Sequence, residues 1–105
     1  MLRVMLVCSA GMSTSLLVTK MKNAAAKDGI DIEIFAVPEV EVKESIDHAD
    51  VVLLAPQVRF LFNKMKQELE PKGIPLAVID GMNYGLMKGE AVVKQALELT
   101  AATKQ

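Results

Sequence analysis

The sequence predicts an α/β fold, a single-domain, doubly wound parallel sheet with helices on both faces. Strand-like apolar runs alternate with segments of helical periodicity four times along the chain, which is typical of parallel strands joined by right-handed helical crossovers. The segment 50–55 is apolar at almost every position, as expected of a strand covered on both faces. With 105 residues, 51% of them apolar, the chain has the size of one domain with one core, and we expect that domain to span residues 1–105.

The first part of the chain predicts two strands and the helix that joins them. Residues 2–7 are a short apolar run that stops at the small residues 8–11, which indicate a tight loop. Hydroxyl residues 13–15 can cap a helix whose apolar positions recur at helical spacing until Asp28–Gly29. Residues 30–37 predict the second strand, which is closed by a proline.

The rest of the chain continues the alternation. Segment 39–48 fits either a strand or a helix, and we favour a short helix because the segment is acidic and joins two strands expected to be parallel. After the buried strand 50–55, we expect a helix over 58–69, a strand over 75–79, a loop over 80–85 and a helix over 88–102.

The charge and composition exclude several classes of protein. Twelve Lys and Arg residues against thirteen Asp and Glu give a net charge of −1, so the chain lacks the basic surface of a nucleic-acid binder. A single cysteine cannot close an internal disulfide and suits a reducing compartment. The longest apolar run, residues 51–56, is too short to cross a membrane, and the amino terminus lacks a signal-peptide pattern. We therefore expect a cytoplasmic protein with no nucleic-acid partner.

Cys8 is placed where doubly wound folds bind ligands, between the end of a strand and the start of a helix. The small residues after it allow backbone amides to approach an anion, and the helix start adds its own unpaired amides and positive dipole end. A lone cysteine at a strand end is more often a buried hydrophobe. Here the setting favours a thiolate that attacks phosphorus, with further donors in the hydroxyls of Ser9, Ser13, Thr14 and Ser15.

Neighbouring chemistries lack residues that they need. A nucleotide-binding phosphate loop requires a lysine where Gly11 is followed by Met12. A low-molecular-weight phosphatase places arginine six residues after its cysteine, and this chain has Thr14 there. A dithiol redox role lacks a second cysteine, and the only histidine, His48, is expected in solvent at the amino end of the sheet. Two further polar residues follow strand ends. Gln57 could donate to phosphate or to a partner, although helix capping explains it equally well, and Asp80 is better explained as a cap or turn carboxylate than as a general acid.

Residues 7–18 closely resemble the IIB components of lactose/cellobiose type from the bacterial phosphoenolpyruvate-dependent sugar phosphotransferase system (PTS). The resemblance continues through residues 49–57 and 78–80 and the pair Tyr84–Gly85, and it covers essentially the whole chain. It implies a sheet of order 2-1-3-4, similar to the low-molecular-weight phosphatase fold. It also implies phosphorylation of Cys8 within a phosphate-binding loop formed by Ser9, Ala10, Gly11, Met12, Ser13, Thr14 and Ser15.

The resemblance further implies a phosphotransferase without metal or organic cofactor. Such a domain accepts a phosphoryl group from phosphohistidine of a IIA protein. It passes the group to a sugar held by the membrane-embedded IIC permease, here a β-linked disaccharide such as cellobiose or chitobiose. The chain would then associate with the permease at the inner face of the membrane without inserting into it. Because both partners must reach one loop, we expect Cys8 to be partly exposed and Met12 to help dock them. Leu16 and Leu17 are weaker candidates for docking, since a helix core explains them.

Two alternatives remain open on the residues alone. One is an enzyme that resembles a low-molecular-weight phosphatase, which would hydrolyse phosphate esters with steady turnover. The other is a non-catalytic anion-binding or interaction module, in which Cys8 would not be needed for binding.

Overall fold

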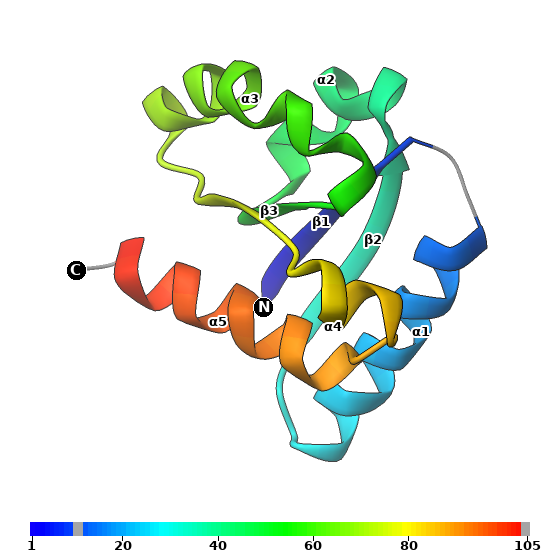
Figure 1. The fold of residues 1–105 in the computed structure, drawn as a ribbon. Coiled ribbons are helices and arrows are strands. Elements are labelled where there is room, and N and C mark those ends of the chain that lie inside the picture. The colour runs from blue at the N-terminus through cyan, green and yellow to red at the C-terminus, as the bar shows by residue number, and fades with distance from the viewer. Residues whose placement is uncertain (10–11, 104–105) are drawn as a thin grey trace.

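The computed structural model describes residues 1–9 and 12–103, and side chains within these ranges except those of residues 12, 13, 102 and 103. Four parallel strands form one sheet in the order β2-β1-β3-β4 (Figure 1). The predicted parallel sheet and its order are therefore confirmed. The strands are β1 Leu2–Cys8, β2 Ile32–Pro38, β3 Val51–Leu54 and β4 Leu76–Val78.

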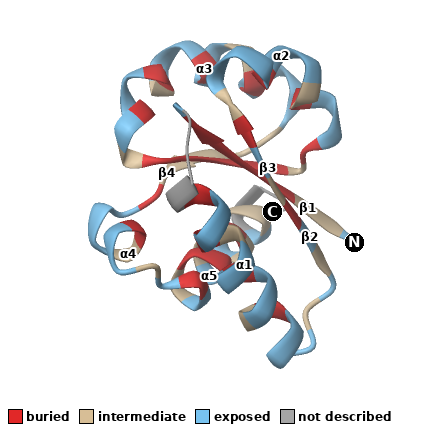
Figure 2. Cartoon of the chain, turned by 90° about the vertical axis from the view of Figure 1, so that its right-hand side faces the viewer, coloured by how far each residue is buried: buried red, intermediate tan, exposed pale blue. Residues whose placement is uncertain are grey.

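Helices cover both faces of this sheet, as predicted. Figure 2 shows α2 and α3 on one side of the strands, with α1, α4 and α5 on the other. The α-helices are α1 Met12–Lys27, α2 Val42–Ser45, α3 Phe62–Leu69, α4 Gly81–Gly85 and α5 Gly89–Thr103. Short 3-10 helices complete the connections: η1 Glu39–Glu41, η2 Ile46–His48, η3 Pro56–Leu61 and η4 Glu70–Lys72.

The core is centred on the two inner strands. Residues 4–7 of β1 and 51–54 of β3 are almost inaccessible to solvent, on both faces of the sheet. Their registers pair Val4 with Val51 and Val7 with Leu54. Because both faces are covered, neither strand needs a polar side, which explains their uninterrupted apolar sequences.

Two glycines follow the ends of helical segments, and one of them, Gly29, lies at a predicted stop. Gly29 follows α1 with φ of 67°, and Gly73 follows η4 with φ of 69°. A side chain at such positive φ meets steric strain that glycine avoids, so these residues turn the chain toward the next strand.

The structure corrects two details of the connections. Residues 80–85 were predicted as a loop, but 81–85 form α4, whose first turn is capped by Asp80: the Met82 amide donates to its carboxylate at 2.8 Å. A five-residue helix is too short to show helical periodicity, so the sequence pattern missed it. The predicted helix over 39–48 is helical, but it is divided into η1, α2 and η2.

Candidate functional site

Cys8 is the last residue of β1, and it lies at the edge of the sheet where all four parallel strands end. It pairs in register with Pro38 of β2, and its Sγ donates a hydrogen bond to the Val37 carbonyl at 3.6 Å. The residue is 8% exposed. The expectation of a partly exposed Cys8 is therefore wrong for this conformation, because the thiol turns toward the backbone of β2 rather than toward solvent.

The start of α1 provides a positive electrostatic environment beside this strand end. The helix begins at Met12, four positions after Cys8, and contains 16 residues with no acidic residue in its first turn. The amides of the first turn lack acceptors within a helix, and they form the positive end of its dipole. An anion at the end of β1 would meet these amides without an opposing carboxylate from the first turn of α1.

The structure distributes the predicted loop residues over different environments. Ser9 and Ser15 are exposed, and the Ser15 carbonyl accepts a hydrogen bond from Thr19 Oγ1 at 3.2 Å. Thr14, by contrast, is 2% exposed. Of the remaining predicted residues, Ala10 and Gly11 lie outside the described residues, as do the side chains of Met12 and Ser13.

Thr14 is joined to a residue that sequence reasoning did not place in the site. Its Oγ1 lies 2.9 Å from the hydroxyl of Tyr84, in α4, and either oxygen could be the donor. Tyr84 is also buried, at 7% exposure. The two residues are 70 positions apart. Tyr84 lies in a segment predicted as a loop, and the only sequence signal for it is its place in the family resemblance.

Exposed apolar side chains follow the ends of all four strands. Of the six large hydrophobic residues that are exposed in the described part of the chain, Met1 alone precedes the sheet. Leu17 is fully buried, whereas Leu16 is half exposed, so the two neighbours play different roles. We call the other five residues, which follow strand ends in the sequence, the carboxyl-end rim: Leu16 in α1, Val40 in η1, Phe60 in η3, Met82 in α4 and Leu86 after α4.

The other polar candidates have structural positions. His48 is exposed at the end of η2, just before β3 begins, and therefore lies at the amino end of the sheet as expected. Asp80 caps α4, and Gln57 is exposed in η3. Within the described ranges, no three His, Cys, Asp or Glu residues are arranged to hold a metal ion. No helix formed by residues 12–103 is long and apolar enough to cross a membrane.

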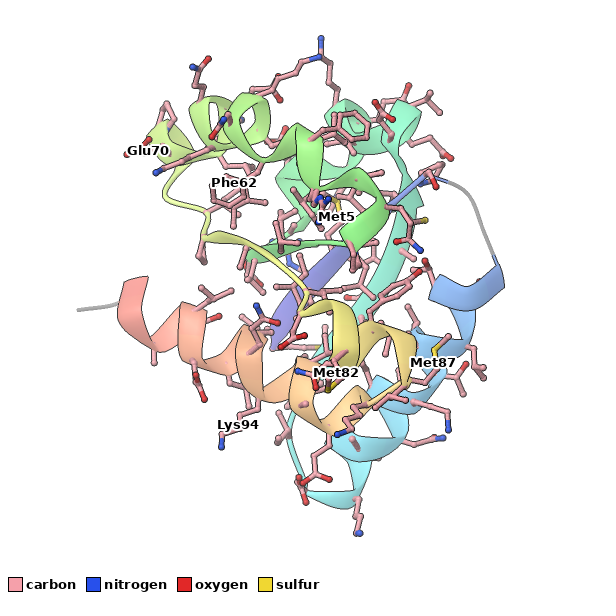
Figure 3. All side chains as sticks on the ribbon, viewed as in Figure 1. Met5, Phe62, Glu70, Met82, Met87 and Lys94 are labelled. Carbon is pink, nitrogen blue, oxygen red and sulfur yellow. The ribbon has the colours of Figure 1, made fainter. Side chains whose placement is uncertain are left out.

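Side chains labelled in Figure 3 mark the two ends of the sheet. Glu70, in η4, precedes β4 and lies far to one side of the molecule, while Met87 follows α4 on the other side. β1 ends and α1 starts on the same side of the molecule as Met87 (Figure 1).

Comparison with known proteins gives consistent matches over most of the chain. The model of the family described as PTS system, lactose/cellobiose-specific IIB subunit, matches residues 3–95. The oligo-beta-mannoside-specific EIIB component of Bacillus subtilis (strain 168) is 46% identical over 99 residues, covering 94% of this chain and 96% of that protein. The solution structure of the cellobiose-specific phosphotransferase IIB component from Borrelia burgdorferi superposes with a TM-score of 0.81 at 40% identity, covering 97% of this chain and 94% of that one.

A longer relative contains a similar segment within a larger chain. The lactose-specific EIICB component of Lactococcus lactis subsp. lactis is 32% identical over 81 residues. The match covers 77% of this chain but 14% of the relative.

Proposed function

Because the chain belongs to the lactose/cellobiose-specific IIB subunit family of the PTS, we propose that Cys8 is the residue on which it carries a phosphoryl group. Family membership makes the chain a IIB component of a sugar phosphotransferase system and a phosphotransferase. The observation that supports Cys8 as the carrier is its position: the only cysteine of the chain ends β1, four positions before α1 begins.

The proposed reaction has two transfers. In the first, Cys8 Sγ attacks the phosphorus of phosphohistidine on a IIA protein; the S–P bond forms, the N–P bond breaks, and the thiol proton passes to the histidine nitrogen. In the second, a sugar hydroxyl attacks the same phosphorus, the S–P bond breaks, and the hydroxyl proton returns to the sulfur. Sγ must leave the Val37 carbonyl before either partner can reach it.

Residues 9–15 are proposed to hold the phosphoryl group between these transfers. Backbone amides at the helix start supply fixed donors, and the exposed hydroxyls of Ser9 and Ser15 can add to them. Position 14 offers no guanidinium, because it is a threonine whose side chain is buried against Tyr84. Charge that develops during attack by water is therefore less well stabilised than in a phosphatase, which favours a carrier over a hydrolase.

We propose a IIA protein as donor and a IIC permease as the partner that holds the sugar. The carboxyl-end rim supports this proposal, because exposed apolar side chains around a reactive group suit contacts with other proteins. The longer relative is named as an EIICB component, which agrees with a IIC partner and with a place beside the membrane. The names of the relatives include oligo-beta-mannoside and cellobiose, so a β-linked disaccharide such as cellobiose or chitobiose is the proposed substrate.

Intact-mass measurement after incubation with phosphorylated IIA tests the carrier mechanism. The parent chain should gain one phosphoryl group, Cys8→Ser should gain none, and Thr100→Val, an unrelated change in α5, should behave like the parent. Equal phosphorylation of Cys8→Ser would overturn the proposal. Steady turnover of an aryl phosphate would instead indicate a phosphatase, and phosphate binding that is non-covalent and unaffected by Cys8→Ser would indicate an anion-binding module.

A further inference from the structure

We propose that Tyr84 is a positioning residue for phosphoryl transfer and acts on Cys8 through Thr14. The inference rests on the proposed role of Cys8 and adds to it a residue from the opposite end of the chain. Its basis is the buried hydroxyl pair formed by Thr14 Oγ1 and the Tyr84 hydroxyl, 2.9 Å apart.

The pair lies at a sensitive point of α1. Thr14 is the third residue of that helix, so its backbone amide is one of the first-turn amides proposed to face the phosphoryl group. Apart from aromatic residues, Thr14 has the only buried polar or charged side chain in the described part of the chain. A hydroxyl this deeply buried is stable only with a partner, and Tyr84 supplies that partner.

The position of Tyr84 is in turn fixed by its own backbone. The Tyr84 amide donates to the Asp80 carbonyl at 2.9 Å, while the Asp80 carboxylate caps the first turn of α4. The neighbouring Met82 and Leu86 are exposed, whereas Tyr84 points inward and is buried. The hydroxyl is therefore held at a defined place relative to the end of β4.

The resulting link crosses the edge of the sheet. The strand order places β3 between β1 and β4, so α4 reaches past the end of β3 to touch the helix that starts after Cys8 (Figure 1). The contact ties the first turn of α1 to a second, separately anchored element. Amides that stabilise a transition state must hold their positions closely, since small displacements lower the rate strongly.

Removing the hydroxyl of Tyr84 tests this link with little change in packing. Tyr84→Phe keeps the ring but leaves Thr14 without its partner, and Thr14→Val removes the other hydroxyl at similar volume. We expect each to lower kcat for transfer from phosphorylated IIA roughly tenfold, with KM for IIA nearly unchanged. Thr14→Ser, which keeps the hydroxyl, should lose less than Thr14→Val. The double variant should be no slower than the slower of the two single variants, because both break the contact between Thr14 and Tyr84.

A second measurement follows Cys8 without any partner protein. Alkylation of Cys8 by iodoacetamide reports how well the nearby amides stabilise the thiolate. We expect Tyr84→Phe and Thr14→Val to be alkylated more slowly at neutral pH. Thr100→Val serves as the matched control, since it removes a hydroxyl that donates to the Ala96 carbonyl within α5.

Several results would overturn the inference. The inference fails if Tyr84→Phe has the same transfer and alkylation rates as the parent, or if its rates fall no more than those of Thr100→Val. It also fails if the losses of the two single variants add in the double variant. If Tyr84→Phe fails to fold, the comparison of Thr14→Ser with Thr14→Val still decides, and equal losses would contradict the link. Phosphorylation of Cys8→Ser would instead contradict the proposed function, while the alkylation experiment would still test the role of Tyr84.

Discussion

The two ends of the sheet are built on different principles. At the amino end, Arg3 pairs with Asp50, its Nε 3.4 Å from the carboxylate, and Lys72 pairs with Asp47 at 3.0 Å. Arg3 lies at the start of β1, and the other three residues precede β3 or β4. At the carboxyl end, where Cys8 lies, the strands are followed by the apolar carboxyl-end rim and by the buried Thr14–Tyr84 contact.

The two ends therefore differ in the side chains that they leave available to a partner protein. Two pairs of charges at the amino end meet within the chain. The carboxyl end leaves apolar side chains in solvent and turns the positive end of α1 toward Cys8. With a net charge of −1, the chain has no basic surface over which affinity for phosphate could be spread, so the proposed phosphate site depends on that one turn.

The largest effect is expected where the backbones of α5 and α1 approach each other. A Cβ on Gly89 would lie 2.5 Å from the carbonyl carbon of Lys20 and 2.6 Å from the amide nitrogen of Met21. Gly89→Ala therefore forces α5 away from α1, and we expect a loss of about 2–3 kcal/mol in the free energy of unfolding. Urea unfolding measures it.

Gly81→Ala is the matched control for this variant. Gly81 also starts a helix, yet a Cβ there meets nothing within 4 Å. Equal losses for the two alanine variants would show that close backbone packing is not the cause.

The next effect concerns the carboxyl-end rim itself. Leu86 is 62% exposed after α4, so Leu86→Lys should leave unfolding within about 0.5 kcal/mol while raising KM for phosphorylated IIA roughly tenfold. Glu70→Gln, at the other end of the sheet, changes the net charge by the same amount and should leave KM alone. If both variants changed KM equally, overall charge rather than an apolar contact would govern docking.

The predictability of the two ends from sequence also differs. Apolar runs such as 51–54 were enough to predict the strands and their parallel arrangement, because these features depend on local pattern. The small residues after Cys8 support the proposal that it carries a phosphoryl group. The burial of Cys8 and its bond to Val37 depend on how β2 lies beside β1, and no local pattern encodes that. The same holds for Tyr84, whose hydroxyl matters only once α4 has folded against α1.

A smaller effect, dependent on pH, is expected at the amino end. Partial burial raises the pKa of Asp50. Hydrogen bonds from the Arg3 amide at 2.8 Å and from the Arg3 side chain, together with the positive charges nearby, outweigh this effect, so the pKa lies below its usual value of 3.8. The ionised carboxylate therefore stabilises the fold above the pKa of the unfolded chain, and this contribution is lost as the pH falls through the lower pKa of the folded chain. Because Asp50 is 39% exposed at its side chain, Asp50→Asn should cost less than about 1 kcal/mol at neutral pH.

Urea unfolding of the parent and of Asp50→Asn at several pH values checks this prediction. The difference between them should be constant near neutral pH and should disappear in acid below the lowered pKa of Asp50. A difference that grows in acid would mean that Arg3 does not favour the ionised form.

The smallest effect is expected from the second ion pair of the same end. Lys72 and Asp47 are 3.0 Å apart, but their side chains are 47% and 75% exposed. Water competes for both charges, and ordering two side chains offsets much of their attraction, so Lys72→Met should change the free energy of unfolding by less than about 0.5 kcal/mol. The small difference should vanish in high salt, because exposed charges are screened there. Phosphoryl transfer should not change, since the pair lies at the end opposite Cys8. A slower transfer in Lys72→Met at unchanged stability would show that the amino end also contacts a partner, and the division between the two ends would then fail.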